Sequence, residues 1–247
     1  MQASARVIAE VDDDGITRLV RLRGEPPLLL RETPTVDGSA EVHLVGGAAG
    51  PLGGDRLSLR IEVGPRAVLC LRTVAASIAL PGRGRDSSLV SVTASVAGGG
   101  ELRWLPEQLV AAAGCRHHAV NTVELAPGAR LLWRDELVCG RWREEPGDAE
   151  IATSVTYADR ALLRQSLSVG PSTPGWSGPA VLAGAKATGS LLRVDAAMPQ
   201  QGPVVLGPTA VSMPLAGPAR LITATAPDAH TLRSLLDPCS TGMVSRR

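Results

Sequence analysis

The sequence has 247 residues, with 25 basic and 24 acidic side chains and a formal net charge of +1 at pH 7. This length allows one large domain that buries a core without disulfides or metals. The near-neutral charge argues against a nucleic-acid-binding protein and against a basic patch for membrane surfaces. Hydrophobic residues make up 44% and aromatic residues only 2%, with no Phe. We therefore expect a globular protein whose core consists mainly of Ala, Val and Leu.

The four cysteines stand at positions 70, 115, 139 and 239, and no two have the C-x-x-C spacing of a zinc ribbon or a redox motif. The N-terminal region carries the acidic run 12–14, whereas a signal peptide would have a basic and then an apolar segment. No stretch of 18 apolar residues could span a membrane. These features predict a cytoplasmic protein with reduced cysteines and without a membrane partner.

Alternation of apolar and polar residues predicts a mainly β protein. Apolar residues take every second position from Leu57 to Val63, and the pattern returns at 90–96 and 151–157. A further run at 163–169 follows a turn at 158–160. Because successive side chains of a strand point to opposite faces, each run predicts a strand with one buried face.

Gly and Pro residues interrupt these runs at regular intervals. The turns at 64–65, 98–100 and 127–128 each have a β-type run on both sides: 57–63 and 67–73, 90–96 and 101–105, 119–125 and 130–138. This spacing predicts layered sheets of stacked hairpin-like units, as in a β-solenoid or a β-sandwich. Residues 171–220 are rich in Pro and Gly but keep apolar runs, so short strands and loops are expected there. We expect a single domain over residues 1–247.

Two segments favour a helix. Residues 106–113 begin with Pro and precede Gly114, which suits two helical turns. The segment 228–236 is the stronger candidate, because its three leucines share one face and Pro238 follows. The fold is therefore predicted to carry a small C-terminal helical element.

Several catalytic motifs are missing from the sequence. Lys186 is the only lysine and stands between two alanines, so the chain has no Walker A motif for a nucleoside triphosphate. It also has no G-x-S-x-G and no H-E-x-x-H motif. Asp135 and Glu136 lie on a predicted strand and would point to opposite faces, so they cannot flank one bond as an acid–base pair. We expect one to be solvated and the other to pair with Arg134 or Arg141.

Cys115, His117 and His118 form a cluster of soft ligands that suits nickel, copper or zinc. On a strand, Cys115 and His117 would share one face and His118 would oppose them. A closed site would need further ligands such as His43. The alternative is a buried cysteine beside surface histidines.

Five segments, in the same order, resemble the urease accessory protein family called UreD or UreH. They are Pro51–Asp55 (P-L-G-G-D), 68–77 (V-L-C-L-R-T-V-A-A-S), Trp104–Pro106 (W-L-P), 123–130 (V-E-L-A-P-G-A-R) and Gly140–Arg141. The strongest match spans residues 42–145, and 226–236 resembles the family's C-terminal helix. Ile78 and Arg103 stand where many members have Lys and Glu.

The resemblance implies a mainly β urease maturation factor that is not an enzyme. Such proteins act as a scaffold or chaperone with a UreF-like helical protein and a UreG-like GTPase. The complex docks on urease apoprotein and helps insert nickel, which a UreE-like donor supplies indirectly. No tightly bound cofactor is implied, only transient Ni²⁺ on an internal route through the β body. Such a route needs weak, exchangeable ligands.

The resemblance also implies residues for the nickel passage or the partner interface: Gly53, Gly54, Asp55, Glu107, Glu136 and Arg141. Asp55 has an equally good interpretation as a turn residue whose side chain caps the following strand. For Glu136 and Arg141 an internal ion pair is slightly favoured. Docking on partners predicts an exposed apolar surface.

Two other functions fit the composition alone. One is a β-rich carbohydrate-acting enzyme that uses carboxylates such as Asp55 and Glu136, although the scarcity of aromatic residues leaves few platforms for sugar stacking. The other is a β-rich module that binds a small ligand.

Overall fold

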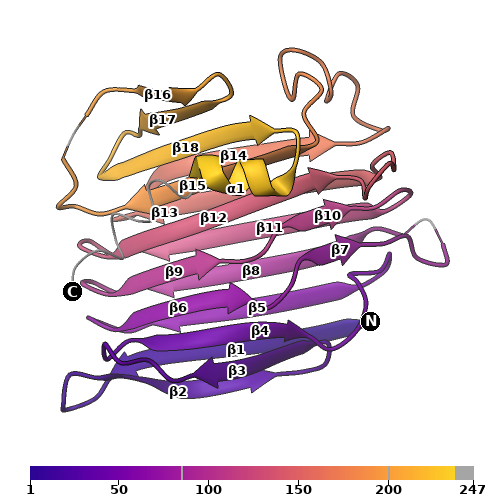
Figure 1. Cartoon of the computed structure of the whole chain (residues 1–247). Helices are drawn as coiled ribbons and strands as arrows, with labels where there is room; N and C mark the ends of the chain where they lie inside the picture. The colour runs from indigo at the N-terminus through magenta and orange to yellow at the C-terminus, as the bar shows by residue number, and fades with distance from the viewer. Residues whose placement is uncertain (85, 200, 237–247) are drawn as a thin grey trace.

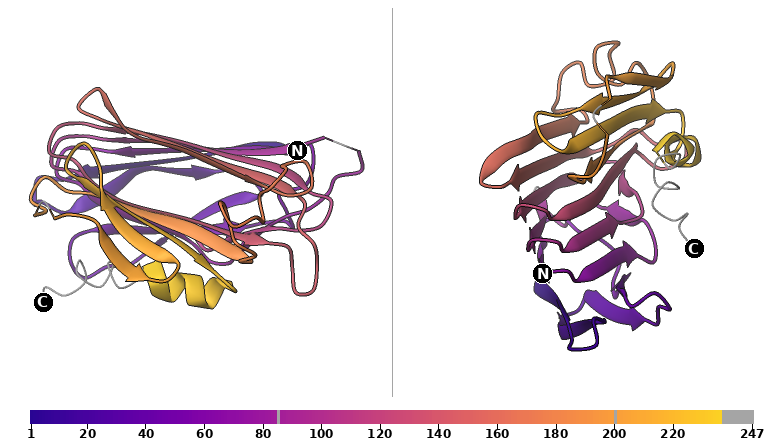
Figure 2. Two further views of the ribbon diagram at one scale, coloured as in Figure 1. Left: turned by 90° about the horizontal axis from the view of Figure 1, so that it is seen from above. Right: turned by 90° about the vertical axis from the view of Figure 1, so that its left-hand side faces the viewer.

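Successive coils of the chain alternate between two β-sheets that lie face to face, and the coils stack along one direction (Figures 1 and 2). The computed structural model describes residues 1–84, 86–199 and 201–236. In the right-hand view of Figure 2 the strands of each layer are stacked one above another, and the two layers lie side by side. The predicted mainly β, solenoid-like fold is confirmed.

The first sheet has seven strands, and its central strands are parallel. In spatial order they are β14 (Arg160–Val169), β13 (Asp148–Tyr157), β11 (Arg116–Leu125), β8 (Ser88–Val96), β5 (Arg56–Val63), β1 (Gln2–Val11) and β2 (Thr17–Gly24). The predicted strands at 57–63, 90–96, 151–157 and 163–169 all lie in this sheet.

The second sheet has eleven strands. Nine follow one path: β16 (Val204–Gly207), β17 (Ala210–Pro214), β18 (Ala219–Ala226), β15 (Ala187–Val194), β12 (Arg130–Cys139), β9 (Glu101–Leu105), β6 (Val68–Thr73), β4 (Ala40–Gly46) and β3 (Leu28–Thr33). The short strand β10 (Leu109–Ala111) pairs with β12 and with β7 (Ser77–Ala79). The segment 171–220 contributes short strands and loops, as expected.

In the middle of the chain each coil carries one strand into the first sheet and one long strand into the second, where β6 and β9 are each followed by a short strand, β7 or β10. The chain passes from β5 to β6, from β8 to β9 and from β11 to β12, and a backbone hydrogen bond closes each connecting turn, as between the Ala67 nitrogen and the Gly64 oxygen at 3.2 Å. The two strands of a unit pair with their equivalents in the next coil, as in Leu57↔Val90, and not with each other. The units are therefore arches whose strands face each other across the core, in contrast to hairpins.

The core fills the space between the sheets. Alternate residues of β5 are buried, including Leu59 and Ile61, and the same phase continues through Val92 and Val123. Besides Trp104 and Trp133, whose rings lie 5.5 Å apart, this core is built largely of Val, Leu and Ala. The expectation from composition is confirmed.

Helix α1 (Ala229–Leu236) packs on the outer face of the eleven-stranded sheet, over β18, β15 and β12 (Figure 1). This confirms the C-terminal helix, although Pro238 lies outside the described residues. The predicted helix at 106–113 is wrong, because 109–111 is a strand. Pairing with β12 and β7 supplies hydrogen bonds that local helix propensity does not outweigh.

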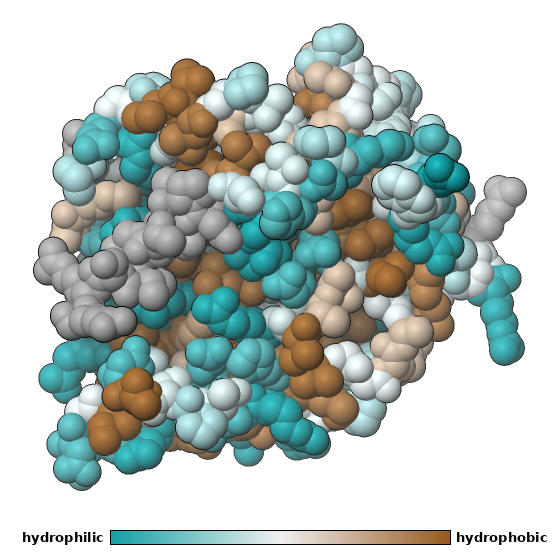
Figure 3. Space-filling view, viewed as in Figure 1, coloured by the Kyte–Doolittle hydropathy of each residue, from teal (hydrophilic) through white to brown (hydrophobic). Residues whose placement is uncertain are grey.

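The face of the molecule seen in Figure 1 is mostly hydrophilic, with separate apolar patches between the polar side chains (Figure 3). No helix in the described part of the chain is long and apolar enough to cross a membrane. The three described cysteines, Cys70, Cys115 and Cys139, are buried free thiols. Cys239 lies outside the described residues.

Candidate functional site

The core changes from apolar to polar near its C-terminal end. A row of residues that pair in register across the seven-stranded sheet faces inward. It consists of Leu59 on β5, Val92 on β8, Asn121 on β11, Thr153 on β13 and Gln165 on β14. Asn121 and Thr153 are both buried. The last three residues of this row are polar, unlike the rest of the core. Their side chains therefore require polar partners inside the molecule.

Asp135 supplies these partners from the opposite sheet. Its carboxylate accepts hydrogen bonds from the Thr153 hydroxyl at 2.7 Å, from the Asn121 amide at 3.2 Å and from the Trp133 indole nitrogen at 3.1 Å to each oxygen. All three donors are neutral. Burial raises the pKa of Asp135 to about 6, and the hydrogen bonds from Thr153, Trp133 and Asn121 oppose that rise.

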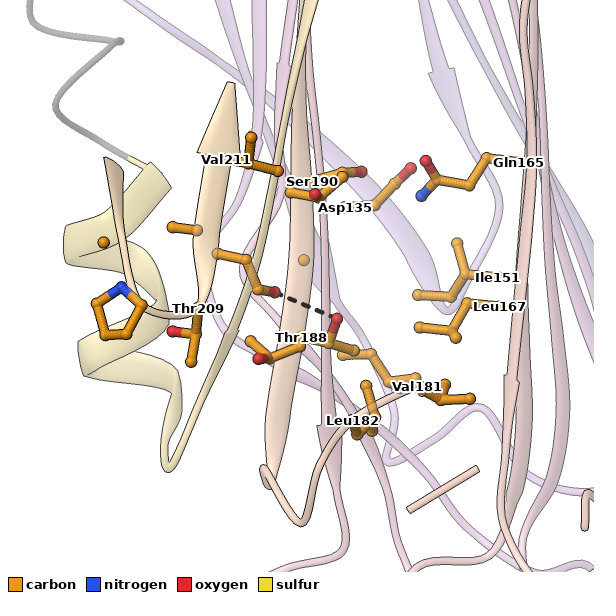
Figure 4. A pocket seen from close by; sticks show the side chains of 18 of the residues that line it. Asp135, Ile151, Gln165, Leu167, Val181, Leu182, Thr188, Ser190, Thr209 and Val211 are labelled. Atoms are coloured by element: carbon orange, nitrogen blue, oxygen red, sulfur yellow. Dashed lines mark hydrogen bonds between the residues drawn. The ribbon is translucent and has the colours of Figure 1, made fainter. Parts of the chain in front are cut away.

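The Asp135 carboxylate lies at the wall of a cavity of about 520 Å³ between the two sheets. In Figure 4 the carboxyl group of Asp135 and the amide group of Gln165 point toward each other, with Ser190 beside them. The Thr188 hydroxyl donates to the Ala224 carbonyl at 3.3 Å on the same wall. Apolar side chains complete the lining, among them Leu137, Ile151, Leu167, Val181, Leu182 and Val211. The cavity thus combines one carboxylate and several neutral oxygens with an apolar remainder.

Glu136 points away from this cavity, as the alternation along β12 predicts. Its carboxylate forms ion pairs with Arg134 at 2.9 Å and with Arg233 of α1 at 2.5 Å. Arg233 also reaches Glu107 at 3.2 Å, so two of the predicted site residues meet at one guanidinium. The expected ion pair with Arg134 is confirmed for Glu136. Asp135 is half-buried and its carboxylate accepts hydrogen bonds from neutral side chains, so it is not the fully solvated residue that was expected.

Arg141 lies elsewhere, on an exposed turn. It binds Glu144 with hydrogen bonds of 2.8 and 2.6 Å, and the pKa of Glu144 is lowered by these contacts. The favoured ion pair between Glu136 and Arg141 is therefore not formed: β12 ends at Cys139, and the following turn folds Arg141 back on its own carboxylate partner.

Gly53, Gly54 and Asp55 form a tight turn between two coils. A Cβ atom on Gly53 would lie 2.6 Å from the Asp86 carbonyl oxygen and 2.7 Å from the Gly82 nitrogen, so only glycine fits. Asp55 accepts hydrogen bonds from the Leu52 backbone at 2.9 Å and from the Met1 ammonium at 2.8 Å. These contacts match the interpretation of Asp55 as a turn residue.

The predicted soft-ligand cluster is split among different environments. Cys115 is buried just before β11, and its thiol donates to the Asp148 carbonyl at 3.6 Å. The His117 ring is also buried and bonds the Ser88 hydroxyl at 2.9 Å, whereas His118 is exposed beside Glu150. Burial raises the pKa of Cys115 to about 11 and lowers that of His117 to about 4.

Within the described residues, no group of three or more His, Cys, Asp and Glu side chains could hold a metal. His43, suggested as a further ligand, lies on β4 of the other sheet. Its ring forms a hydrogen bond of 2.8 Å with the Thr33 hydroxyl. The alternative of surface histidines beside a buried cysteine fits His118 but not His117, which is 2% exposed.

Sequence reasoning missed Thr153, Gln165 and Ser190. The available signal was a polar residue in the buried phase of an alternating run, as at Thr153 between Ile151 and Val155. Nothing in the sequence connects that signal to Asp135, because the partners come from three other strands.

A family model described as "UreD urease accessory protein" matches residues 1–241. "Urease accessory protein UreD" of Streptomyces avermitilis is 45% identical over 96% of this chain and 95% of its own length. "Urease accessory protein UreD 3" of Streptomyces griseus subsp. griseus is 46% identical over 96% and 95%. A UreD of Parafrankia is 41% identical over 96% of this chain and 87% of its own.

The chain belongs to the UreD family of urease accessory proteins. The predicted resemblance is confirmed and extends well beyond residues 42–145. Family membership implies a role in urease maturation as an assembly factor rather than as a catalyst. It also implies association with other urease accessory factors or urease.

In this UreD chain, several segments that carried the resemblance build the fold. Gly53 allows two turns to meet, and Trp104 packs in the core beside Trp133. The cavity, by contrast, draws much of its lining from residues after 145, such as Gln165 and Ser190. The cavity at Asp135 therefore lies only partly in the segments that revealed the family.

Proposed function

We propose that this UreD chain is a scaffold and chaperone for urease maturation, without catalytic activity of its own. It works in a complex with a UreF-like helical protein and a UreG-like GTPase, which docks on urease apoprotein so that nickel enters the active site. A UreE-like donor supplies the metal to that complex. The family match over residues 1–241 carries this proposal.

The cavity at Asp135 is our candidate for the nickel passage. Its lining offers one carboxylate, the amide of Gln165 and the hydroxyls of Thr188 and Ser190, and the described lining residues include neither Cys nor His. Oxygen ligands bind nickel more weakly than thiolates and imidazoles, so an ion held here would exchange readily. With a pKa of about 6, Asp135 is mostly ionised at pH 7 and attracts a cation.

The remaining predicted residues fit other roles in this proposal. Glu107 and Glu136 are neutralised by arginines, so their contribution is to the docking of α1. Arg141 stays a candidate for a partner interface, because the neighbouring Trp142 is 87% exposed. An exposed tryptophan on a turn suits a contact with another protein.

The carbohydrate-acting alternative receives no support from the geometry. Asp55 is occupied by a backbone amide and an ammonium group, and Glu136 by two guanidinium groups. The two carboxylates therefore lack the open, paired arrangement that glycoside hydrolysis uses.

The experiment replaces the chain in a host that carries the whole urease operon. Deleting it should leave normal amounts of urease apoprotein with little nickel and low activity, and returning the gene should restore both. Asp135→Asn should lower the nickel bound per apoprotein, whereas Glu62→Gln, on the outer face of β5, should not. Fully nickel-loaded urease in the deletion strain would refute the maturation role. Normal loading with Asp135→Asn would refute only the passage.

A further inference from the structure

Strand β14 gives the seven-stranded sheet one long edge that pairs with no other strand of the described chain. It has ten residues, whereas the other edge strands have eight (β2), six (β3) and four (β16). Its pairing with β13 keeps one register from Ala149↔Val169 to Val155↔Leu163. Proteins protect their sheets from other chains with short or irregular edge strands, so a long regular edge is a template for one more strand.

The hydrogen bonds between β13 and β11 show which backbone groups β13 turns toward β14. The Asp148 nitrogen donates to the Cys115 oxygen at 2.8 Å, and the nitrogen of Ala158, just after β13, donates to the Leu125 oxygen at 2.9 Å. The even-numbered residues of β13 therefore bond β11. Because the backbone groups of successive residues alternate between the two sides of a strand, the odd-numbered residues of β13 bond β14.

The unpaired backbone groups of β14 follow from this alternation. The partners of the odd-numbered β13 residues include Gln165 and Leu167, whose N–H and C=O groups are therefore used by β13. The N–H and C=O groups of Arg164, Ser166 and Ser168 point to the free edge. Outside the paired strands, no backbone hydrogen bond among the described residues reaches 160–169.

This free edge runs along the mouth of the cavity. Gln165 and Leu167 point from β14 into the cavity (Figure 4). The Ser166 side chain points the other way by the alternation of the strand, and yet Ser166 lines the cavity. Two valines of the same lining, Val181 and Val205, are 42% and 79% exposed. A strand added to β14 would cover apolar side chains that water now reaches.

The outer face of β14 sets the chemistry of such a strand. Arg164 is exposed opposite Ser154, and it forms no ion pair with another residue of the described chain. Cross-strand neighbours favour opposite charges and pairs of hydroxyl residues. The matching segment therefore has an acidic residue opposite Arg164 and Ser or Thr opposite Ser166 and Ser168. Its residues opposite Leu163 and Leu167 face the cavity and are apolar.

We propose that the free edge of β14 is a docking site for an extended segment of another protein, in which apolar residues alternate with hydroxyl and acidic ones. The segment joins the sheet as a further strand, with affinity from backbone hydrogen bonds and specificity from alternate side chains. A second copy of β14 does not fit, because residues 160–169 contain no Asp or Glu to meet Arg164. The proposal concerns this edge alone and holds whether or not nickel passes through the cavity.

The test titrates the full chain with the capped peptide T-V-T-T-E-V-T, which in the antiparallel orientation places its glutamate opposite Arg164. Amide NMR and hydrogen exchange report the site. We expect saturable binding that slows exchange at Arg164, Ser166 and Ser168. Gln165 and Leu167 should be unchanged, because their amides already bond β13.

A charge exchange separates specific docking from non-specific adhesion. Arg164→Glu should weaken binding of the glutamate peptide about tenfold, and the peptide T-V-T-T-K-V-T should bind this variant more tightly than it binds the wild type. Arg21→Glu, at an exposed position of the edge strand β2, should leave both affinities unchanged. Ser166→Pro removes an N–H of the free edge and no bond to β13, so it should abolish binding. Should Ser166→Pro not fold, the charge exchange decides.

Three results would overturn the proposal. The first is no binding of the glutamate peptide at millimolar concentration. The second is equal binding of both peptides to the wild type and to Arg164→Glu, because docking at this edge must respond to the charge. The third is protection of the same three amides without peptide, rising with protein concentration, which would assign the edge to a second copy of the chain.

Discussion

The half-buried carboxylate of Asp135 should make the protein less stable as the pH rises from about 4 to 7. The pKa of Asp135 is raised from 3.8 to about 6 in the folded protein. Between these values the folded state binds more protons than the unfolded state, so the contribution is present below 3.8 and is lost as the pH rises through 6. At about 1.4 kcal/mol for each unit, the difference is about 3 kcal/mol.

Urea denaturation of the wild type and of Asp135→Asn, at intervals from pH 4 to 8, measures this contribution. The free energy of unfolding of the wild type minus that of the variant should be largest near pH 4 and fall by about 2–3 kcal/mol towards pH 7, with most of the change between pH 4 and 6 and little above it. The subtraction cancels every other titrating group. A difference that stays flat, or that grows with pH, would refute the assignment of Asp135 as a group whose pKa is raised in the folded protein.

Three further predictions follow from buried contacts. His117, with a pKa lowered to about 4 from 6.5, should cost the protein about 3 kcal/mol as the pH falls through that interval, and His117→Gln should remove this acid sensitivity in urea titrations. Trp133→Phe removes the buried indole donor of the Asp135 carboxylate and should lower stability by about 1–3 kcal/mol, whereas Trp142→Phe at an exposed site should change it by less than about 0.5 kcal/mol. Gly53→Ala should lower the melting temperature or prevent folding, because its Cβ would lie 2.6 Å from a backbone oxygen, while Gly202→Ala, with open space around it, should melt like the wild type.

The strands of the coils were predictable because each has one wet and one buried face. The alternation at 57–63 records that environment residue by residue, and β5 follows it. The segment 109–111 was not predictable, because it becomes a strand only through its neighbours β12 and β7. Local sequence carries no record of a pairing partner.

In the candidate site, too, the local pattern was predictable and the contacts between distant strands were not. The opposite orientations of Asp135 and Glu136 came from the period of a strand and are confirmed. Their partners could not be foreseen, since Arg233 is 97 residues from Glu136 and Thr153 is 18 from Asp135. Contacts of that kind depend on the stacking order of the coils, which the turn spacing suggested but did not specify.

The stacking of parallel strands in register has a further consequence at its ends. Such a ladder is also the geometry by which protein fibrils grow, because every open edge is a template for one more strand. Here the direction reverses at each edge: β2 and β14 close the first sheet with antiparallel partners, and β3 and β16 close the second. A copy whose strands run in the direction of the coils could pair with these edges only in antiparallel fashion, so the parallel ladder does not continue unbroken from one molecule to the next.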